Sequence, residues 1–189
     1  RAEQTASLPA FTPPGIREAD LSRLLLDCAA FGVADPASLA FLASRQHDAV
    51  GCMVFDESIR DFRPPSSRTG KLQGVMHSID GASPGTGTRY AHPFEKFGEQ
   101  ISRRGLVAVI SDFYCDADSL LEGVRPLAWQ GQDVVLFQIL DSQELDPDIS
   151  ENVLFEDVET GESIEVAPTF MNDEYPQRIR EHVKRIAQV

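Results

Sequence analysis

The distribution of apolar residues along this chain predicts strands and helices that follow one another in alternation. Residues 105–112 form a continuous apolar and largely β-branched run that ends in Asp112, which is typical of a buried parallel strand. Residues 133–140 form a second run of this kind. Between them, residues 116–130 carry leucine and valine at helical spacing. We expect Pro126 to kink or shorten that helix, because proline removes one helical hydrogen bond.

The first half of the chain shows the same alternation. Asp35 followed by Pro36 predicts a helix, because an acidic N-cap and a proline at the first helical position both favour a helix start. A strand is expected over 49–55, and residues 59–62, which precede two prolines, suit a short edge strand. Two further helices with apolar residues at helical spacing are expected, over 72–81 and 93–103.

The N-terminal part of the chain has a different composition. Residues 1–19 contain several prolines and predict an extended leader or the remnant of an upstream region, so that one domain covers residues 20–189. Two interpretations of residues 20–27 stay open: a first strand that closes before Asp27, or a helix capped by its opening aspartate. Because the sequence begins at Arg1 rather than methionine, we also expect that an upstream part has been removed.

The C-terminal part completes the predicted fold. Residues 153–166 are typical of a hairpin, which we place at the margin of the sheet, and residues 177–189 predict an amphipathic closing helix. Strands separated by helices of this length imply right-handed crossovers. The expected fold class is therefore α/β: a doubly wound, mainly parallel sheet with helices on both faces and one antiparallel edge strand.

The length, net charge and cysteine content of the chain limit the kinds of molecule it is expected to bind and the compartment expected for it. With 189 residues and 42% hydrophobic content, the chain can bury one full core. The net charge of -13 argues against nucleic acid or an anionic membrane as the partner. No apolar run reaches the length of a membrane span, and the three cysteines lack metal-ligand spacing. We therefore expect a cytoplasmic protein with reduced cysteines and no membrane contact.

The negative charge is concentrated near the C-terminus. Residues 141–175 contain twelve acidic residues and no lysine or arginine. Two interpretations are open: a solvated face, or a docking surface for a basic partner.

Two candidate ligand side chains are expected near the end of the strand predicted over 105–112. The Gly-rich loop 83–88 ends in Thr88, whose hydroxyl could join the carboxylate of Asp112 at the C-terminal edge of the sheet, where open α/β sheets bind ligands. One hydroxyl and one carboxylate suit a hard cation such as Mg²⁺. The alternative is structural, with both side chains bonding in loops. Nucleotide hydrolysis is not expected, because the loop lacks the lysine of a phosphate-binding loop.

Four segments of the chain occur in the order found in one known family: 48–56, 84–88, 110–112 and 155–162. They resemble the von Willebrand factor A-like family called domain of unknown function 58, which is often associated with MoxR-type AAA+ ATPases. The likeness covers residues 35–185, and the acidic Thr-Gly hairpin is its most specific motif.

The resemblance implies a metal-ion-dependent adhesion site. In that family an Asp-x-Ser-x-Ser motif after the first strand, a later threonine and an aspartate after the fourth strand hold the ion. Thr88 and Asp112 match the last two, and Asp27 is the best-placed aspartate for the first. The sequence departs there, because Ala29 and Phe31 stand where serines belong. Either the site has degenerated, or residues that held the serines are missing from this segment.

The resemblance also implies a function. It predicts a non-catalytic protein–protein interaction module, an adaptor for a MoxR-type AAA+ ATPase, in which Mg²⁺ held by Asp27, Thr88 and Asp112 leaves one position open for a partner carboxylate. No organic cofactor is expected. The alternative is a metal-dependent hydrolase that uses the same edge of the sheet.

Overall fold

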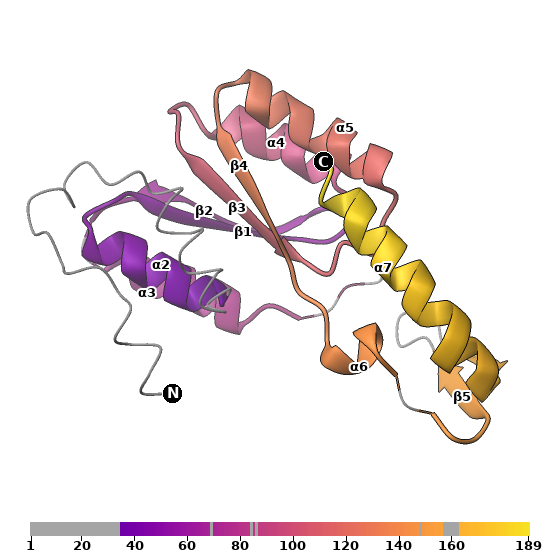
Figure 1. Cartoon of the computed structure of the whole chain (residues 1–189). Helices are drawn as coiled ribbons and strands as arrows, with labels where there is room; N and C mark the ends of the chain where they lie inside the picture. The colour runs from indigo at the N-terminus through magenta and orange to yellow at the C-terminus, as the bar shows by residue number, and fades with distance from the viewer. Residues whose placement is uncertain (1–34, 69, 84, 86, 148, 157–162) are drawn as a thin grey trace, which may run out of the picture.

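The structure is a computed structural model, and it describes residues 35–189 apart from 69, 84, 86, 148 and 157–162 (Figure 1). The expectations for the leader 1–19 and for a strand or helix before Asp27 lie outside the described residues.

The first described elements follow the predicted pattern. Helix α2 (Pro36–Arg45) begins at the predicted N-cap, where the Asp35 carboxylate accepts a hydrogen bond of 2.8 Å from the backbone N–H of Ser38. Strand β1 (Val50–Phe55) pairs antiparallel with β2 (Ile59–Ser66). The predicted strand and the antiparallel edge strand are both confirmed.

Strand β2 is longer than expected, because it continues through Pro64 and Pro65 to Ser66. Prolines are tolerated in a strand that has one unpaired side, and the pairing of β1 with β2 is irregular at this point. Gly51 makes the close approach there possible, since a Cβ on Gly51 would lie 2.6 Å from the carbonyl oxygen of Arg63.

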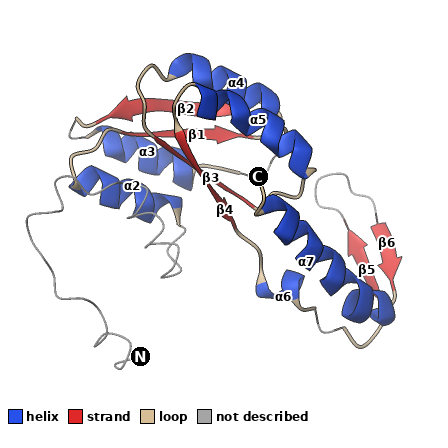
Figure 2. Ribbon diagram, turned by 45° about the horizontal axis from the view of Figure 1, so that its top comes forward, coloured by secondary structure: helices blue, strands red, loops and turns tan. Residues whose placement is uncertain are grey.

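Two helices follow on opposite sides of the strands. Helix α3 (Lys71–Asp80) ends at Gly81 as predicted, and α4 (Ala91–Gln100) covers most of the expected 93–103. Helix α4 begins earlier than expected, at Ala91. It also ends earlier than expected, because the backbone at Ile101 is already extended. In Figures 1 and 2, α2 and α3 lie on one side of the strands, and α4 lies on the other.

The two strands predicted from apolar runs are confirmed as a parallel pair, but their predicted burial is only partial, because Val109 and Phe137 alone are buried among their residues. Strand β3 (Leu106–Ser111) and β4 (Asp133–Gln138) run in register, with Leu106 opposite Asp133 and Ser111 opposite Gln138. Helix α5 (Ala117–Trp129) connects them and packs on the side of α4 (Figure 2). It continues three residues past Pro126 instead of ending there, because so few residues follow the lost hydrogen bond.

The described residues therefore form a mixed α/β structure, which agrees with the expected class in its coarser terms. Their strands form three two-stranded sheets, β1–β2, β3–β4 and β5–β6, of which β3–β4 is parallel.

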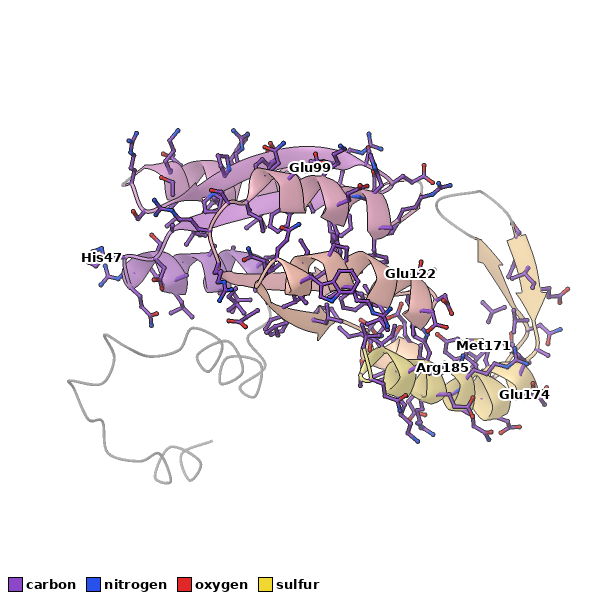
Figure 3. The ribbon with its side chains drawn as sticks, turned by 90° about the horizontal axis from the view of Figure 1, so that it is seen from above. His47, Glu99, Glu122, Met171, Glu174 and Arg185 are labelled. Carbon is purple, nitrogen blue, oxygen red and sulfur yellow. The ribbon has the colours of Figure 1, made fainter. Side chains whose placement is uncertain are left out.

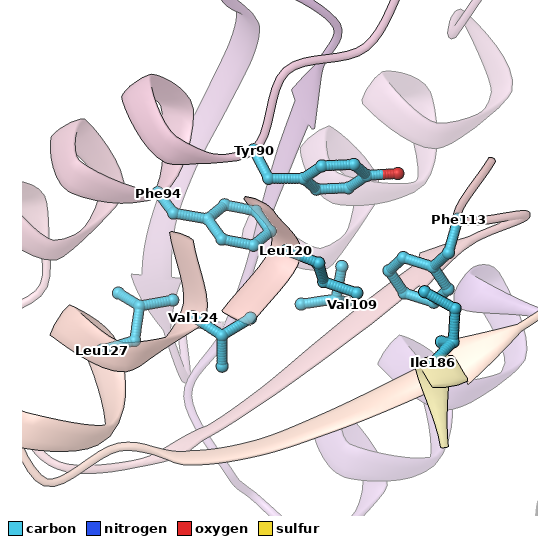
Figure 4. Close-up of a cluster of buried hydrophobic side chains, with 8 residues drawn as sticks. All are labelled: Tyr90, Phe94, Val109, Phe113, Leu120, Val124, Leu127 and Ile186. Atoms are coloured by element: carbon cyan, nitrogen blue, oxygen red, sulfur yellow. The ribbon is translucent and has the colours of Figure 1, made fainter. Parts of the chain in front are cut away.

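The main core lies between the strands and helices α4 and α5. Its buried members come from five parts of the chain and are shown in Figure 4: Tyr90, Phe94, Val109, Phe113, Leu120, Val124, Leu127 and Ile186. The ring of Phe55 in β1 meets the rings of Tyr90 and Phe94 edge-on, at centroid distances of 5.9 and 5.3 Å. Strand β1 is thereby attached to the same core as β3.

The C-terminal elements extend away from this core. They are α6 (Ser142–Leu145), β5 (Val153–Glu156), β6 (Ser163–Val166), the π-helix η3 (Phe170–Glu174) and α7 (Tyr175–Ile186). The hairpin β5–β6 exists as predicted, but its placement at the margin of the sheet was wrong. The segment 139–152 carries the chain beyond the end of β4, so that β5 and β6 pair with each other near α7 (Figure 2).

The predicted closing helix is confirmed as α7, which starts two residues earlier than expected. It buries Ile179 and Ile186 and exposes charged residues. Figure 3 shows Glu174 at its N-terminal end and Arg185 in its last turn. The position of Arg185 suits the helix dipole, which favours a base in the last turn, whereas Glu174 belongs to η3, which runs directly into α7.

The core makes a stability prediction. Leu120 is completely buried, so Leu120→Ala should lower the free energy of unfolding by about 3 kcal/mol through lost burial and a residual cavity. Trp129 ends the same helix at 81% exposure, and Trp129→Ala should cost less than about 0.5 kcal/mol. Urea denaturation of both variants measures the difference, and equal losses would contradict this description of the core.

Candidate functional site

The candidate site begins where β3 ends. The hydroxyl of Ser111 accepts a hydrogen bond of 3.1 Å from the backbone N–H of Phe113 and lies 3.3 Å from the carboxylate of Asp112. Phe113 has a φ of 54°, in the left-handed region that bulky residues rarely adopt. Its ring is fully buried in the core, which holds the backbone in that conformation. The turn after β3 is therefore rigid, and it fixes the position of Asp112.

Tyr90 connects this turn to the loop that contains Thr88. The Tyr90 ring is buried, and its hydroxyl oxygen lies 3.0 Å from the Ser111 hydroxyl oxygen. Burial raises the pKa of Tyr90 to about 12, so the phenol stays neutral and serves as a hydrogen-bond partner.

A second aspartate, Asp56, directly follows β1 and is hydrogen-bonded to the loop that contains Thr88. Asp56 is 6% exposed, and its carboxylate accepts hydrogen bonds from the backbone N–H of Ser58 and from the Arg60 guanidinium, at 3.0 and 2.5 Å. The backbone carbonyl of Asp56 also accepts a hydrogen bond of 3.2 Å from the N–H of Arg89. The Ser58 N–H, and after it Arg60, lower the pKa of the Asp56 carboxyl.

Asp56 was missed in the sequence analysis although a signal was present. It follows the predicted strand 49–55 in the same way that Asp112 closes 105–112. It acts as a positioning residue, because Gly85 packs so closely that a Cβ on that glycine would lie 2.5 Å from the Asp56 carboxylate.

The structure places the predicted metal ligands as follows. Thr88 and Asp112 are both exposed, while Asp27 lies outside the described residues. Among the hydrogen bonds of the described part, none joins Thr88 to Asp112, and the link between their segments runs through Tyr90 and Ser111.

The donor set within the described residues does not fit Mg²⁺ by itself. No group of three or more His, Cys, Asp or Glu side chains that could hold a metal ion occurs there. An octahedral ion needs several oxygen ligands at close to ideal geometry. The metal site therefore stays a prediction that depends on Asp27.

Apolar side chains stand exposed around Asp112. Tyr114 is 49% exposed and Ile139 is 46% exposed. The N–H of Ile139 donates a hydrogen bond of 2.9 Å to the carbonyl oxygen of Ser111, which keeps Ile139 beside the turn. Asp112, Tyr114 and Ile139 are thus exposed residues that follow the C-terminal ends of β3 and β4, and we call these three residues the edge patch.

Helix α7 contacts the turn that carries the edge patch through His182. A ring nitrogen of His182, Nε2, lies 2.8 Å from the carbonyl oxygen of Phe113. A carbonyl can only accept, so the nitrogen is the donor. The imidazole also stacks against the Tyr114 ring, with a centroid distance of 6.0 Å and an interplanar angle of 14°. The exposed Tyr114 ring is therefore held in one orientation.

The structure describes two of the three cysteines. Cys52 and Cys115 are unpaired thiols. Burial raises the pKa of both thiols, which disfavours the nucleophilic thiolate at neutral pH.

The fold and the site together define an α/β protein that presents a rigid polar and apolar surface at the C-terminal end of parallel strands. The chain belongs to the family described as "Protein of unknown function DUF58", which matches residues 30–187. The resemblance stated from the sequence motifs is confirmed at the level of this family. Neither a curated protein nor a solved structure matches the chain. Among the described helices, none has the length and apolar character needed to cross a membrane.

The buried carboxylate makes a pH prediction. Because the pKa of Asp56 is lowered in the folded state, its contribution to stability is present above the ordinary value of 3.8 and is lost as the pH falls through the folded value. Asp56→Asn should lower the melting temperature at pH 7, and the gap to the wild type should shrink below pH 3.8.

Glu57→Gln is the matched control for Asp56→Asn, since Glu57 is the neighbouring acid and is half exposed. Thermal denaturation between pH 2 and 7 measures the effect. A gap between Asp56→Asn and the wild type that stays constant over this range would contradict a stabilising charged carboxylate.

Proposed function

We propose that this chain is a non-catalytic protein–protein interaction module that docks a partner protein on the edge patch. The observation that carries the proposal is the exposure of the aromatic Tyr114 and the aliphatic Ile139 near the exposed carboxylate of Asp112, next to a turn that is hydrogen-bonded and anchored by the buried Phe113. Exposed apolar groups of this kind mark interaction surfaces when they gather around a polar group.

The edge patch has the physical properties of a docking anchor. Tyrosine contributes a large contact area and loses little conformational entropy when it is already held in place, as the His182 stacking holds Tyr114. The Asp112 carboxylate adds a charge that selects a partner with a lysine or arginine opposite it.

The family resemblance suggests the partner. It favours a MoxR-type AAA+ ATPase, with this chain as an adaptor, and a von Willebrand factor A-like fold for the complete domain. The net charge of -13 supports a partner that offers a basic surface.

Mg²⁺ is an additional element of the proposal, and docking on the edge patch does not depend on it. When bound, the ion would supply a positive anchor for a partner carboxylate, and Thr88 and Asp112 are the described residues that would contribute oxygens. Because the described donors do not complete a site without Asp27, we derive docking from the edge patch alone.

The first functional prediction concerns Tyr114. Tyr114→Ala should weaken binding to a purified MoxR-type AAA+ ATPase by tenfold or more, because truncation of an anchor residue typically costs about 2 kcal/mol or more and about 1.4 kcal/mol is a factor of ten. Trp129→Ala removes a more exposed aromatic ring from the far end of α5 and should leave the affinity unchanged. Interferometry measures both, and equal affinities for the two variants would refute docking on the edge patch.

The second functional prediction concerns metal removal. Since docking is derived from side chains alone, binding to the ATPase should survive excess EDTA. Loss of binding in EDTA would show that one of the two proteins needs a divalent ion, because the ATPase itself uses Mg²⁺ with its nucleotide. Calorimetry with Mg²⁺ on this chain and on Asp112→Ala would then show whether the ion binds at Asp112. Asp133→Ala is the matched control, because Asp133 is an exposed aspartate at the opposite end of the parallel pair.

The hydrolase alternative makes an opposite prediction for the same variant. A hydrolase at this edge requires turnover of a substrate that disappears in Asp112→Ala. The interaction module requires no turnover in either protein and weaker partner binding in the variant.

A further inference from the structure

One face of the β5–β6 hairpin is turned to solvent. Leu154 of β5 and Glu165 of β6 are directly opposite each other in the antiparallel register, so their side chains lie on the same face. Leu154 is 67% exposed, and Glu165 is exposed as well. Val153 and Val166 oppose each other on the other face and are half-buried. We call the face that carries Leu154 and Glu165 the outer face of the hairpin.

The outer face combines an apolar side chain with a fixed negative charge. The Glu165 carboxylate accepts a hydrogen bond of 3.1 Å from the side-chain amide of Asn152, which holds it in place. Among the ion pairs of the described residues, none includes Glu165. A two-stranded hairpin has little stability by itself, so a surface that covers Leu154 would stabilise it. Such a surface needs an apolar group with a base beside it.

The C-terminal end of α5 offers an apolar group of this kind with bases beside it. Trp129 is 81% exposed, the largest value among the exposed large hydrophobic side chains of the described part. Arg125 lies one helical turn earlier and is exposed. Arg104 lies over the turn that follows α5, since a Cβ on Gly131 would be 2.7 Å from its Nε. Tryptophan and arginine are enriched at the hot spots of protein interfaces.

The spacing of the two pairs of side chains matches. Residues directly opposite in an antiparallel hairpin have Cβ atoms about 5 Å apart, and residues four apart on a helix have Cβ atoms about 5–6 Å apart. Trp129 can therefore cover Leu154 while Arg125 faces Glu165. In this arrangement the apolar contact supplies affinity, and the exposed charge pair selects the orientation.

The two surfaces lie in different parts of the molecule. Trp129 precedes the start of β4, whereas the hairpin follows its end after the segment 139–152. They therefore lie beyond opposite ends of β4, and in Figure 2 the hairpin stands near α7, away from the start of that strand. Two copies of the chain can bring together what one copy keeps apart.

We propose that the chain associates head to tail with a second copy of itself, the outer face of the hairpin in one copy docking on Trp129 and Arg125 of the next. The contact is heterologous and leaves one surface free at each end, so association continues beyond two chains unless a ring closes. The net charge of -13 makes copies repel each other, so the contact is expected to be weak. This inference does not rest on the proposed function.

Analytical ultracentrifugation of the full 189-residue chain tests the proposal. The average mass of the wild type should rise with protein concentration up to about 1 mM, without a plateau at two chains. Trp129→Ala and Leu154→Ala should each weaken the association by tenfold or more. Ile164→Ala is the matched control, because Ile164 is 65% exposed on the opposite face of the same hairpin, and it should leave the association unchanged.

A mixture of the two weakened variants tests the head-to-tail arrangement. Trp129→Ala keeps an intact hairpin, and Leu154→Ala keeps an intact tryptophan surface. Mixed together, they should form a complex of one chain of each variant with the affinity of the wild-type contact. No larger species should appear, because the remaining two surfaces of that complex are both altered.

Three results would overturn the proposal. A wild type that sediments as a single chain at about 1 mM would show that copies do not associate. Variants that lose association alone and do not bind each other in the mixture would indicate a contact between identical surfaces. Equal losses in Ile164→Ala and Leu154→Ala would exclude the outer face as the docking surface. If Leu154→Ala does not fold, Glu165→Lys replaces it, with the same expected results in both experiments.

Discussion

The buried ring of Phe113 is the interaction on which the rest of the structure depends. It holds the backbone after β3 in a left-handed conformation and packs 5.9 Å from the ring of Tyr90. Helix α7 meets the same residue twice, through Ile186 in the core and through His182 at the Phe113 carbonyl. The parallel pair, the loop before α4 and the closing helix therefore converge on one turn, and their relative positions are fixed there.

This convergence explains how a rigid surface arises at the end of a strand. The turn after β3 is hydrogen-bonded within itself through Ser111 and Asp112 and to its surroundings through Tyr90 and His182, while Tyr114 and Ile139 remain about half exposed. A docking surface built in this way loses little entropy on binding.

Sequence patterns predicted much of the fold because the signals were local. The apolar runs of β3 and β4 and the N-cap at Asp35 determine their elements without reference to distant residues. The extension of β2 and the separate hairpin β5–β6 depend on tertiary placement, which no local pattern contains. The candidate site was predicted only in part: Asp112 was found as a strand end, while the exposure of Tyr114 and Ile139 depends on which side of the turn the core occupies.

The central claim is that partners dock on the edge patch, and an NMR footprint tests it most directly. A MoxR-type AAA+ ATPase would be titrated into the isotopically labelled chain, and the backbone amide signals would be followed. The account predicts the largest changes at residues 111–114 and at Ile139, with α3 unaffected. Changes confined to the acidic residues after β4, with the signals of Tyr114 and Ile139 unmoved, would contradict it.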